Sequence, residues 1–246
     1  MPLNVLLIGA HPDDCDLKAG GLAIMYARAG HRVKCVSVTA GDAGHPTAHG
    51  RALAERRRAE AAEAGRRGGF AYDVLDHRDG FLTPSLDVRW ELLRLVRAWR
   101  AEVVITHRTM DYHPDHRATA TAVMDAVGLV GVPSIESDVP ATRKPLLLHF
   151  ADEFAAPAPF RADLVVPIAP VMDAKLDVLD AHASQMYEWL PWAMNIPNVP
   201  GERGQRLTLL RTFLAAEETF EISEYGSKPA PDELRRLVPF ARNGQV

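Results

Sequence analysis

The chain has 246 residues, a length that suits a single α/β domain with a sizeable core. Its 47% hydrophobic and 24% charged residues match an average soluble globular protein, and a net charge of −4 gives no support for nucleic acid as a partner. No stretch approaches the roughly 20 apolar residues of a membrane span, and two cysteines cannot build a disulfide framework. We therefore expect one cytoplasmic domain over residues 1–246, without a membrane span.

Apolar, strand-like runs alternate with helical patterns through the chain. We expect strands at 3–8, 33–39, 72–76, 102–107, 146–150 and 163–168, and helices at 17–29, 47–64, 88–99 and 171–182. The segment 185–206, which carries Trp189 and Trp192, is expected to be a long loop at the rim of a site. Four β–α alternations imply parallel strands with right-handed crossovers, which is a Rossmann-like three-layer α/β sandwich with a mostly parallel central sheet.

A polar cluster follows the first expected strand. It reads Gly9-Ala10-His11-Pro12-Asp13-Asp14-Cys15-Asp16. One histidine, three carboxylates and a cysteine are far more ionisable groups than a connecting turn needs. Open α/β sheets bind their ligands at this place, just outside the carboxyl ends of the strands. We expect Asp16 to be the N-cap of the following helix and Cys15 to pack against it as a small neighbour.

A second cluster follows the fourth expected strand. It reads Asp111-Tyr112-His113-Pro114-Asp115-His116. Because Pro114 suits the first position of a helix, His113 and His116 would lie on one side of its first turn. Both clusters follow strands at the same edge of the sheet, so their side chains can meet. Histidine mixed with carboxylate favours zinc or another borderline divalent ion, and a catalytic zinc site needs three such ligands and an open position for water.

The two clusters together carry the groups for metal-assisted hydrolysis of an amide or an ester. The spacing leaves open which aspartate binds the metal and which acts as a base. The alternatives without a chemical role are an Asx-rich turn that caps the first helix, for the first cluster, and a pair of surface histidines at a helix start, for the second. A nucleotide-binding Rossmann-like protein is disfavoured because the first strand–helix turn has Gly9 and then Gly20-Gly21 instead of Gly-x-Gly-x-x-Gly. His45, His49 and His107 could line the mouth of the pocket, but we expect each to be an ordinary loop or strand-end residue.

Charged residues crowd the helix expected at 47–64 and the turn after it. Its arginines are Arg51, Arg56, Arg57, Arg58, Arg66 and Arg67. Because they alternate with Glu55, Glu60 and Glu63 at helical spacings, the residue pattern by itself predicts a solvated helix face.

At these residues the chain resembles the LmbE-like or PIG-L zinc deacetylases, which remove the acetyl group from N-acetylglucosamine units. His-Pro-Asp-Asp at 11–14 and His-Pro-Asp-His at 113–116 carry the resemblance. Further segments similar to the family are 38–44, 57–60, 79–80, 182–185 and 220–224. The resemblance covers most of the chain, and the paired motifs are its specific part.

The resemblance implies a role for each matching residue. It implies one Zn²⁺ per chain held by His11, Asp14 and His116, with Asp13 as the general base. His113 would protonate the departing amine or stabilise the tetrahedral intermediate, oriented by Asp115, while Arg57 and Asp79 would hold sugar hydroxyls. The implied substrate is a small amino sugar or its conjugate, and a homo-oligomer stays open. A competing hypothesis keeps the zinc but makes the substrate a non-sugar or thiol-conjugate amide.

Overall fold

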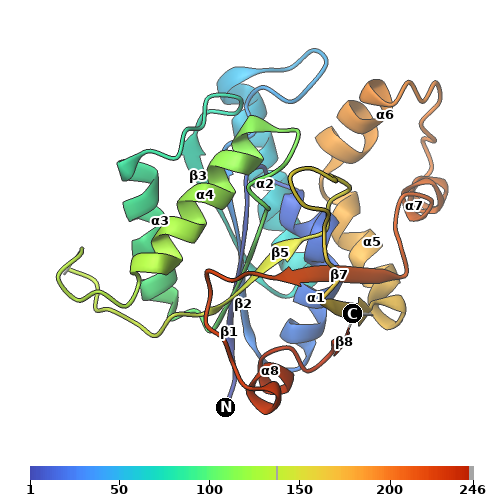
Figure 1. Cartoon of the computed structure of the whole chain (residues 1–246). Helices are drawn as coiled ribbons and strands as arrows, with labels where there is room; N and C mark the ends of the chain where they lie inside the picture. Colours follow the sequence, from blue (N-terminus) through green and yellow to red (C-terminus); the bar gives the residue numbers. More distant parts are fainter. Residues whose placement is uncertain (137, 244–246) are drawn as a thin grey trace.

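The computed structural model describes residues 1–136 and 138–243, and in this part of the chain eight strands form one sheet (Figure 1). The strands are β1 (Asn4–Gly9), β2 (Arg32–Thr39), β3 (Ala71–His77), β4 (Val103–Thr106), β5 (Leu146–Phe150), β6 (Leu164–Pro167), β7 (Glu217–Ile222) and β8 (Arg242–Asn243). Their order across the sheet is β3-β2-β1-β4-β5-β7-β6-β8. Strands β1 to β5 are parallel, whereas β7 is antiparallel to both β5 and β6 and β8 is antiparallel to β6. The expected mostly parallel sheet is confirmed.

Helices cover both faces of the sheet. They are α1 (Asp14–Arg28), α2 (Gly50–Gly68), α3 (Leu86–Trp99), α4 (Pro114–Leu129), α5 (Met172–Asp180), α6 (Leu190–Ala193), α7 (Arg203–Arg211) and α8 (Pro231–Leu237). A 3-10 turn η1 (Ala169–Val171) precedes α5, and a π-helical turn η2 (Ser184–Trp189) follows it. Figure 1 shows α3 and α4 on one side of the sheet and α1, α2 and α5 on the other. The expected three-layer α/β sandwich is therefore confirmed.

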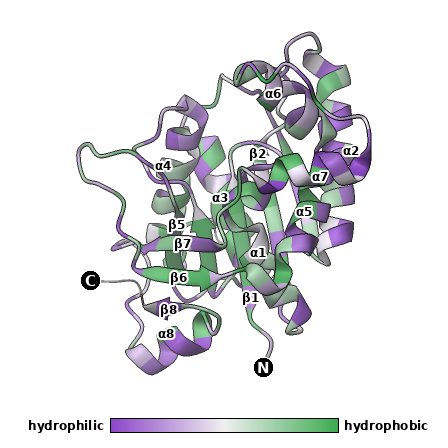
Figure 2. Cartoon of the chain, turned by 90° about the vertical axis from the view of Figure 1, so that its right-hand side faces the viewer, coloured by the Kyte–Doolittle hydropathy of each residue, from purple (hydrophilic) through white to green (hydrophobic). Residues whose placement is uncertain are grey.

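Strand β1 is buried on both faces because its side chains alternate between two hydrophobic cores. Val5 and Leu7 join the core beneath α1 and α5, whereas Leu6 and Ile8 join the core beneath α3 and α4. Figure 2 shows the strands mainly in the hydrophobic colour, with polar residues on the outer helices. Of the described residues, no helix is both long and apolar enough to cross a membrane.

Helix α1 begins three residues earlier than the sequence pattern predicted. The amide of Leu17 donates to the carbonyl of Asp13 at 2.9 Å, which makes Asp13 the N-cap and places Asp14 inside the first turn. The prediction that Asp16 caps this helix is therefore wrong. Asp16 is fully buried, and its carboxylate lies 2.7 Å from Nε2 of His182. Asp16 therefore makes a long-range contact with His182, which no local pattern indicates, instead of capping the helix.

The loop after β2 is longer than predicted, because α2 begins at Gly50 instead of residue 47. The helix continues to Gly68 and ends where Gly69 takes a left-handed conformation with φ of 77°. His45 of this loop places its ring Nε2 at 2.7 Å from the carboxylate of Glu188 in η2. The loop and η2 are thus connected directly at the carboxyl edge of the sheet.

The segment 185–206 is not the unstructured loop that its prolines and tryptophans predicted. It holds most of η2, the short helix α6 and the start of α7. Pro191 lies in the first turn of α6, where a missing amide proton costs nothing. Only residues 194–202 lack helical structure, and this stretch carries the chain from α6 to α7.

Candidate active site

The two polar clusters meet at the carboxyl edge of neighbouring strands β1 and β4. Nε2 of His116 lies 3.3 Å from Nδ1 of His11, and Asp14 approaches each of these nitrogens to 3.5 Å. Ligand atoms held tetrahedrally by zinc at about 2.0–2.2 Å are about 3.3–3.6 Å from one another. The two histidine nitrogens therefore have the mutual spacing that such an ion requires, although the residues lie 105 apart in sequence. Asp14 contacts His11 through Oδ2 and His116 through Oδ1.

Backbone amides hold Asp14 in place. Its Oδ2 accepts from the amides of Ala10 at 2.9 Å and His11 at 2.7 Å, while its Oδ1 faces His116. The turn is too tight for a side chain at Gly9, since a Cβ there would lie 2.7 Å from Cβ of Asp14. One carboxylate oxygen thus fixes the turn and the other is free to bind a cation.

His116 is oriented by two neighbours, Asp111 and His107, to which the sequence pattern assigned no ligand or catalytic role. Its Nδ1 lies 3.1 Å from the carboxylate of Asp111, which leaves Nε2 to face His11 and Asp14. The ring of His107 stacks on that of His116 with a centroid distance of 4.0 Å, and its Nε2 lies 3.1 Å from Asp14. The prediction that His107 is an ordinary strand-end residue is wrong, because it is buried within the site.

Two carboxylates contact the far side of the His11 ring. Its Nε2 lies 3.1 Å from Asp79 and 3.3 Å from Asp115. Asp115 also accepts from the amides of Gly80 at 2.6 Å and Leu82 at 3.2 Å. We expected the Asp115 carboxylate to orient a different histidine, His113. The structure instead shows it fixing His11 and the turn after β3, because α4 points it inward at full burial.

His113 is the N-cap of α4 and lies half-buried beside the cluster. Its Nδ1 accepts from the backbone amide of Asp115 at 3.2 Å. The proton of a neutral His113 ring is therefore on Nε2. Burial and the neighbouring His11 lower the pKa of His113, which favours this neutral form. The ring centroids of His113 and His11 are 4.6 Å apart, so the Nε2 proton is available close to the proposed ligands.

Arg57 reaches the site from α2 and is buried, with only 2% of its surface exposed. Its guanidinium donates to Asp13 at 3.1 Å and to the carbonyls of Pro12 at 3.0 Å and Gly41 at 3.2 Å. The prediction of a solvated face is thus wrong for Arg57, which lies on the inner side of the helix. Asp13 itself has φ of 146°, a conformation that non-glycine residues rarely adopt and that is common at functional sites.

The titration behaviour of the cluster shows that it attracts positive charge. Burial opposes protonation of His11, but Asp115 and Asp14 raise its pKa well above the ordinary value. Asp14 similarly raises the pKa of His116 to about 9 against the effect of burial. Without a metal, protons on these imidazoles balance the surrounding carboxylates. A divalent cation would supply that charge directly, so the donor set suits a metal.

Asp13 differs from the other carboxylates of the site. Burial raises its pKa to about 6, although the positive charge of Arg57 acts in the opposite direction. Burial would also raise the pKa of Asp14, yet His116 and His107 lower it well below the ordinary value. The two adjacent aspartates therefore differ in protonation: Asp14 stays charged, whereas Asp13 can exchange a proton near neutral pH.

A cavity of about 200 Å³ opens over the cluster. It is lined by residues from β–α loops, α1, α2, α4, η2 and α6, namely His11, Asp13, Asp14, Leu17, Gly44, Arg57, Asp79, Tyr112, His113, His116, Gln185, Trp189 and Leu190. Gln185 donates to the carbonyl of Gly44 at 2.9 Å and so joins η2 to the loop after β2. Trp189 stacks on Trp192 at a centroid distance of 5.1 Å, and only Trp189 lines the cavity. The predicted substrate residues Arg57 and Asp79 both face this space.

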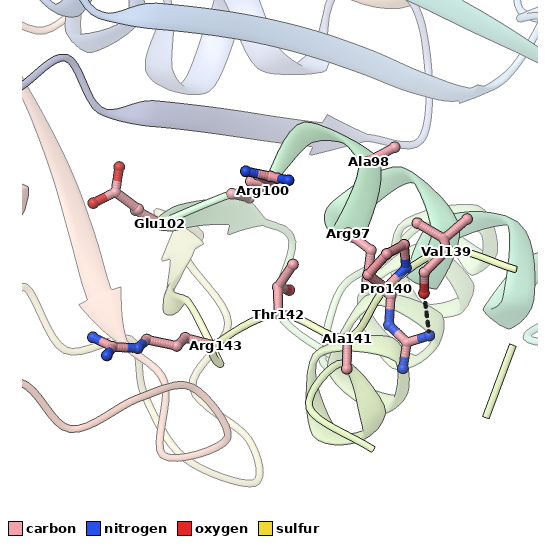
Figure 3. Close-up of a pocket in the computed structure, with 10 residues that line it drawn as sticks. Arg97, Ala98, Arg100, Glu102, Val139, Pro140, Ala141, Thr142 and Arg143 are labelled. Atoms are coloured by element: carbon pink, nitrogen blue, oxygen red, sulfur yellow. Dashed lines mark hydrogen bonds between the residues drawn. The ribbon is translucent and has the colours of Figure 1, made fainter. Parts of the chain in front are cut away.

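A second cavity, of about 480 Å³, lies at the amino end of β4, far from the motifs (Figure 3). Arg97 lies beside it and donates to the carbonyls of Val130, Ile135, Glu136 and Val139, among others. Figure 3 shows the guanidinium turned toward Val139. Because these carbonyls occupy the guanidinium, Arg97 holds the loop after α4, and the charged side chains that remain along the cavity are those of Arg100, Glu102 and Arg143.

Comparisons with known proteins agree with this geometry. Residues 6–127 match the model of the PIG-L family, described as GlcNAc-PI de-N-acetylase. This match includes both polar clusters. The chain is 29% identical over 203 residues to a diacetylchitobiose deacetylase from Thermococcus kodakarensis, covering 77% of this chain and 73% of the relative.

Two solved structures share the fold. One is the N,N′-diacetylchitobiose deacetylase of Pyrococcus horikoshii, with a TM-score of 0.71, 24% identity, and coverage of 90% of this chain and 84% of the other. The other is GalB, a 4-carboxy-2-hydroxymuconate hydratase from Pseudomonas putida, with a TM-score of 0.72, 20% identity, and coverage of 94% and 98%. Since the second protein is named for a different reaction, the fold alone does not determine the activity.

Proposed function

The chain belongs to the PIG-L family of GlcNAc-PI de-N-acetylases, and we propose that it hydrolyses the N-acetyl group of an N-acetylglucosamine-type sugar or its conjugate. Members of this family are amide hydrolases. The observation that carries the proposal is the convergence of His11, Asp14 and His116 within 3.5 Å beside a buried carboxylate of raised pKa.

We propose one zinc ion per chain, held by His11, Asp14 and His116. When bound, such an ion acts as a Lewis acid that acidifies a water molecule and polarises the amide carbonyl. The supporting contacts are those that fix each ligand: Asp79 and Asp115 against His11, and Asp111 against His116. Orientation of ligands by such polar partners is usual at catalytic metal sites.

Asp13 is assigned as the general base. Its carboxylate lies next to the proposed ligands and lines the cavity, and its pKa of about 6 leaves it mostly ionised at neutral pH. It can therefore accept a proton from the attacking water and later pass it to the departing amine nitrogen. Arg57, at 3.1 Å, keeps the carboxylate ionised and fixed in orientation.

His113 is assigned as the group that stabilises the developing oxyanion. The Nε2 proton of its neutral ring can donate to the amide oxygen as negative charge builds up there. Of the two roles that the sequence left open for His113, its lowered pKa supports this one over proton transfer to the amine. Asp115 contributes its backbone amide to His113 and its carboxylate to His11.

The sugar would lie in the 200 Å³ cavity between the loop after β2 and η2. Asp79 and the guanidinium of Arg57 are the charged groups that we assign to its hydroxyls. Trp189, an aromatic residue, also lines this cavity. A zinc amidase that acts on a non-sugar amide would use the same metal and base, so only the identity of the substrate distinguishes it from a sugar deacetylase.

The test combines metal analysis with turnover. Protein purified without added metal should contain about one zinc ion per chain and release acetate from N-acetylglucosamine or its glycosides. Asp13→Asn should retain the metal and lose about 10²–10⁴-fold in kcat, the usual contribution of a positioned base. His116→Ala should lose both metal and activity, whereas His49→Ala, an exposed histidine outside the cavity, should lose neither. Unchanged turnover in Asp13→Asn would show that the base is wrongly assigned.

The amide-containing substrate is identified with a small panel. Acetate and amine release are measured for N-acetylated sugars, for N-acetylated amino acids and for N-acetylated thiol conjugates. Turnover confined to the non-sugar amides would overturn the sugar assignment while leaving the metal and Asp13 in place.

A further inference from the structure

Helix α1 is interrupted after its first turn, because Ala19 has non-helical backbone angles (φ −146°, ψ 17°). The break separates the turn that carries the proposed ligand Asp14 from the rest of the helix. In an unbroken helix, the amide of Gly21 would donate to the carbonyl of Leu17, four residues earlier. The break therefore leaves this amide and this carbonyl in need of other partners.

A buried ion pair occupies the break and supplies both partners. The amide of Gly21 donates to Oε1 of Glu218 in β7 at 2.7 Å, and the amide of Leu22 donates to Oε2 at 2.8 Å. The carbonyl of Leu17 accepts from Nζ of Lys175 in α5 at 2.8 Å. Nζ also lies 2.7 Å from Oε1 of Glu218, and neither side chain is more than 4% exposed. The ion pair thus stands in place of a helical hydrogen bond, and such an insertion is a usual cause of a sharp kink.

Gly21 allows the helix to pack this closely on the sheet. A Cβ at Gly21 would lie 2.5 Å from Cγ2 of Ile168 and 3.0 Å from Oε1 of Glu218. A larger residue would therefore push α1 away from the ion pair. The break belongs to the packed interior of the protein and is not a frayed helix end.

The direction of the first turn of α1 bears on the backbone of Asp13. The amide of Leu17 donates to the carbonyl of Asp13 at 2.9 Å, which ties Asp13 to this turn. On the other side, the amides of Ala10 and His11 hold the segment after β1 through the carboxylate of Asp14. Asp13 joins the two parts with φ of 146°, a strained value that persists only where the surrounding structure imposes it. Closing α1 into a regular helix would turn its first turn and change this angle.

We infer that Lys175 and Glu218 are positioning residues of the active site. By holding the break in α1, they keep Asp13 in its strained conformation, and this conformation directs its carboxylate into the cavity beside the proposed zinc ligands. The inference rests on the proposed function for the role of Asp13 as a base. The strain itself is a property of the folded chain, so it can be measured without any reaction.

Protein stability measures the strain at position 13. Asp13→Gly and Asp13→Ala both remove the carboxylate, but only glycine adopts a positive φ at little cost. In metal-free protein with an intact break, Asp13→Gly should melt about 2–4 °C higher than Asp13→Ala. The same comparison is then made in Lys175→Met/Glu218→Gln, which removes both charges of the ion pair and leaves no unpaired ion at the break.

The glycine–alanine difference should fall to about half or less in that double variant, because α1 can close and position 13 can relax. It should persist in Arg97→Lys, the control, which disturbs a buried cation bound to main-chain carbonyls far from the motifs. Lys175→Met alone replaces the double variant if the latter does not fold, with the same direction of change expected. A difference that is absent while the break is intact, or that stays as large without the ion pair, would overturn the inference.

Turnover tests whether the strain serves the reaction. With zinc supplied and well below the melting temperature, Lys175→Met/Glu218→Gln should lose about tenfold or more in kcat for acetate release from N-acetylglucosamine, because the base is misaligned. Its KM should stay within about twofold, since most of the cavity wall lies outside α1. Arg97→Lys should keep both constants.

The two measurements fail separately. An unchanged kcat in the double variant would overturn the positioning role. If the wild type hydrolyses no N-acetylated amide but the glycine–alanine difference depends on the ion pair, the proposed function fails and the strain assigned to the break stands.

Discussion

Replacing Arg57 with glutamine should shift the pH dependence of the enzyme toward higher pH. The guanidinium of Arg57 lies 3.1 Å from Asp13, and both side chains are almost fully buried. An opposite charge at such a distance typically lowers a carboxyl pKa by about 1–3 units. Its removal should therefore raise the pKa of Asp13 from about 6 by at least one unit, or about 1.4 kcal/mol.

The assay is the pH profile of kcat/KM between pH 5 and pH 9. Because Asp13 must be ionised to accept a proton, the acid limb of Arg57→Gln should lie about one to two units higher than that of the wild type. A bound cation lowers the pKa of Asp13 in both proteins, so the difference between the profiles is what counts. Arg57→Lys keeps the charge and should shift the limb much less.

Protein stability gives a second readout. The pKa of Asp13 in the folded chain is above its ordinary value of 3.8, so the stability it contributes is present below that pH and is lost as pH rises through about 6. Arg57→Gln should deepen this loss, and its melting temperature should fall further below the wild type at pH 8 than at pH 5. An acid limb that stays in place in a folded, metal-loaded Arg57→Gln protein would refute the reasoning.

Two further changes test the support of the site and of the fold. Gly41→Ala should lower kcat/KM at least tenfold, because a Cβ at this position, where φ is +64°, would overlap the guanidinium of Arg57. Gly50→Ala is the control, since Gly50 has a similar φ of +66° but open space around it. This control should lose about 1 kcal/mol of stability and keep its turnover. Lys175→Met should lower the free energy of unfolding by about 3–5 kcal/mol, because it leaves the buried carboxylate of Glu218 without its ion-pair partner. A urea titration that shows a loss below about 1 kcal/mol would contradict this prediction.

The sequence predicted the fold and the meeting of the two polar clusters, because both depend on local signals. Strands alternate with helices in a regular order, and each polar cluster directly follows an apolar run. Since parallel strands end at one edge of the sheet, the topology brings His11, Asp14 and His116 together without any further information. Pro114 likewise marks the start of α4, as the structure confirms.

The contacts around this centre were not predictable, because they depend on packing between distant segments. His107 and Asp111 orient the site only once β4 lies beside β1, and no local pattern assigns this role to either of them. Arg57 is one arginine among several in α2, and its burial follows from the rotation of that helix. Asp16 binds His182 across 166 residues, which no capping rule anticipates.

The distance between the two motifs is set by the spacing of adjacent strands β1 and β4, which the hydrogen bonds of the sheet keep at about 4.8 Å. The walls of the cavity assigned to the substrate come largely from other segments: the loop after β2, and η2 with α6. Insertions or replacements in those walls would leave the sheet edge unaltered. New substrates can therefore be accommodated by exchange of these wall segments alone, while the catalytic centre at the sheet edge remains intact.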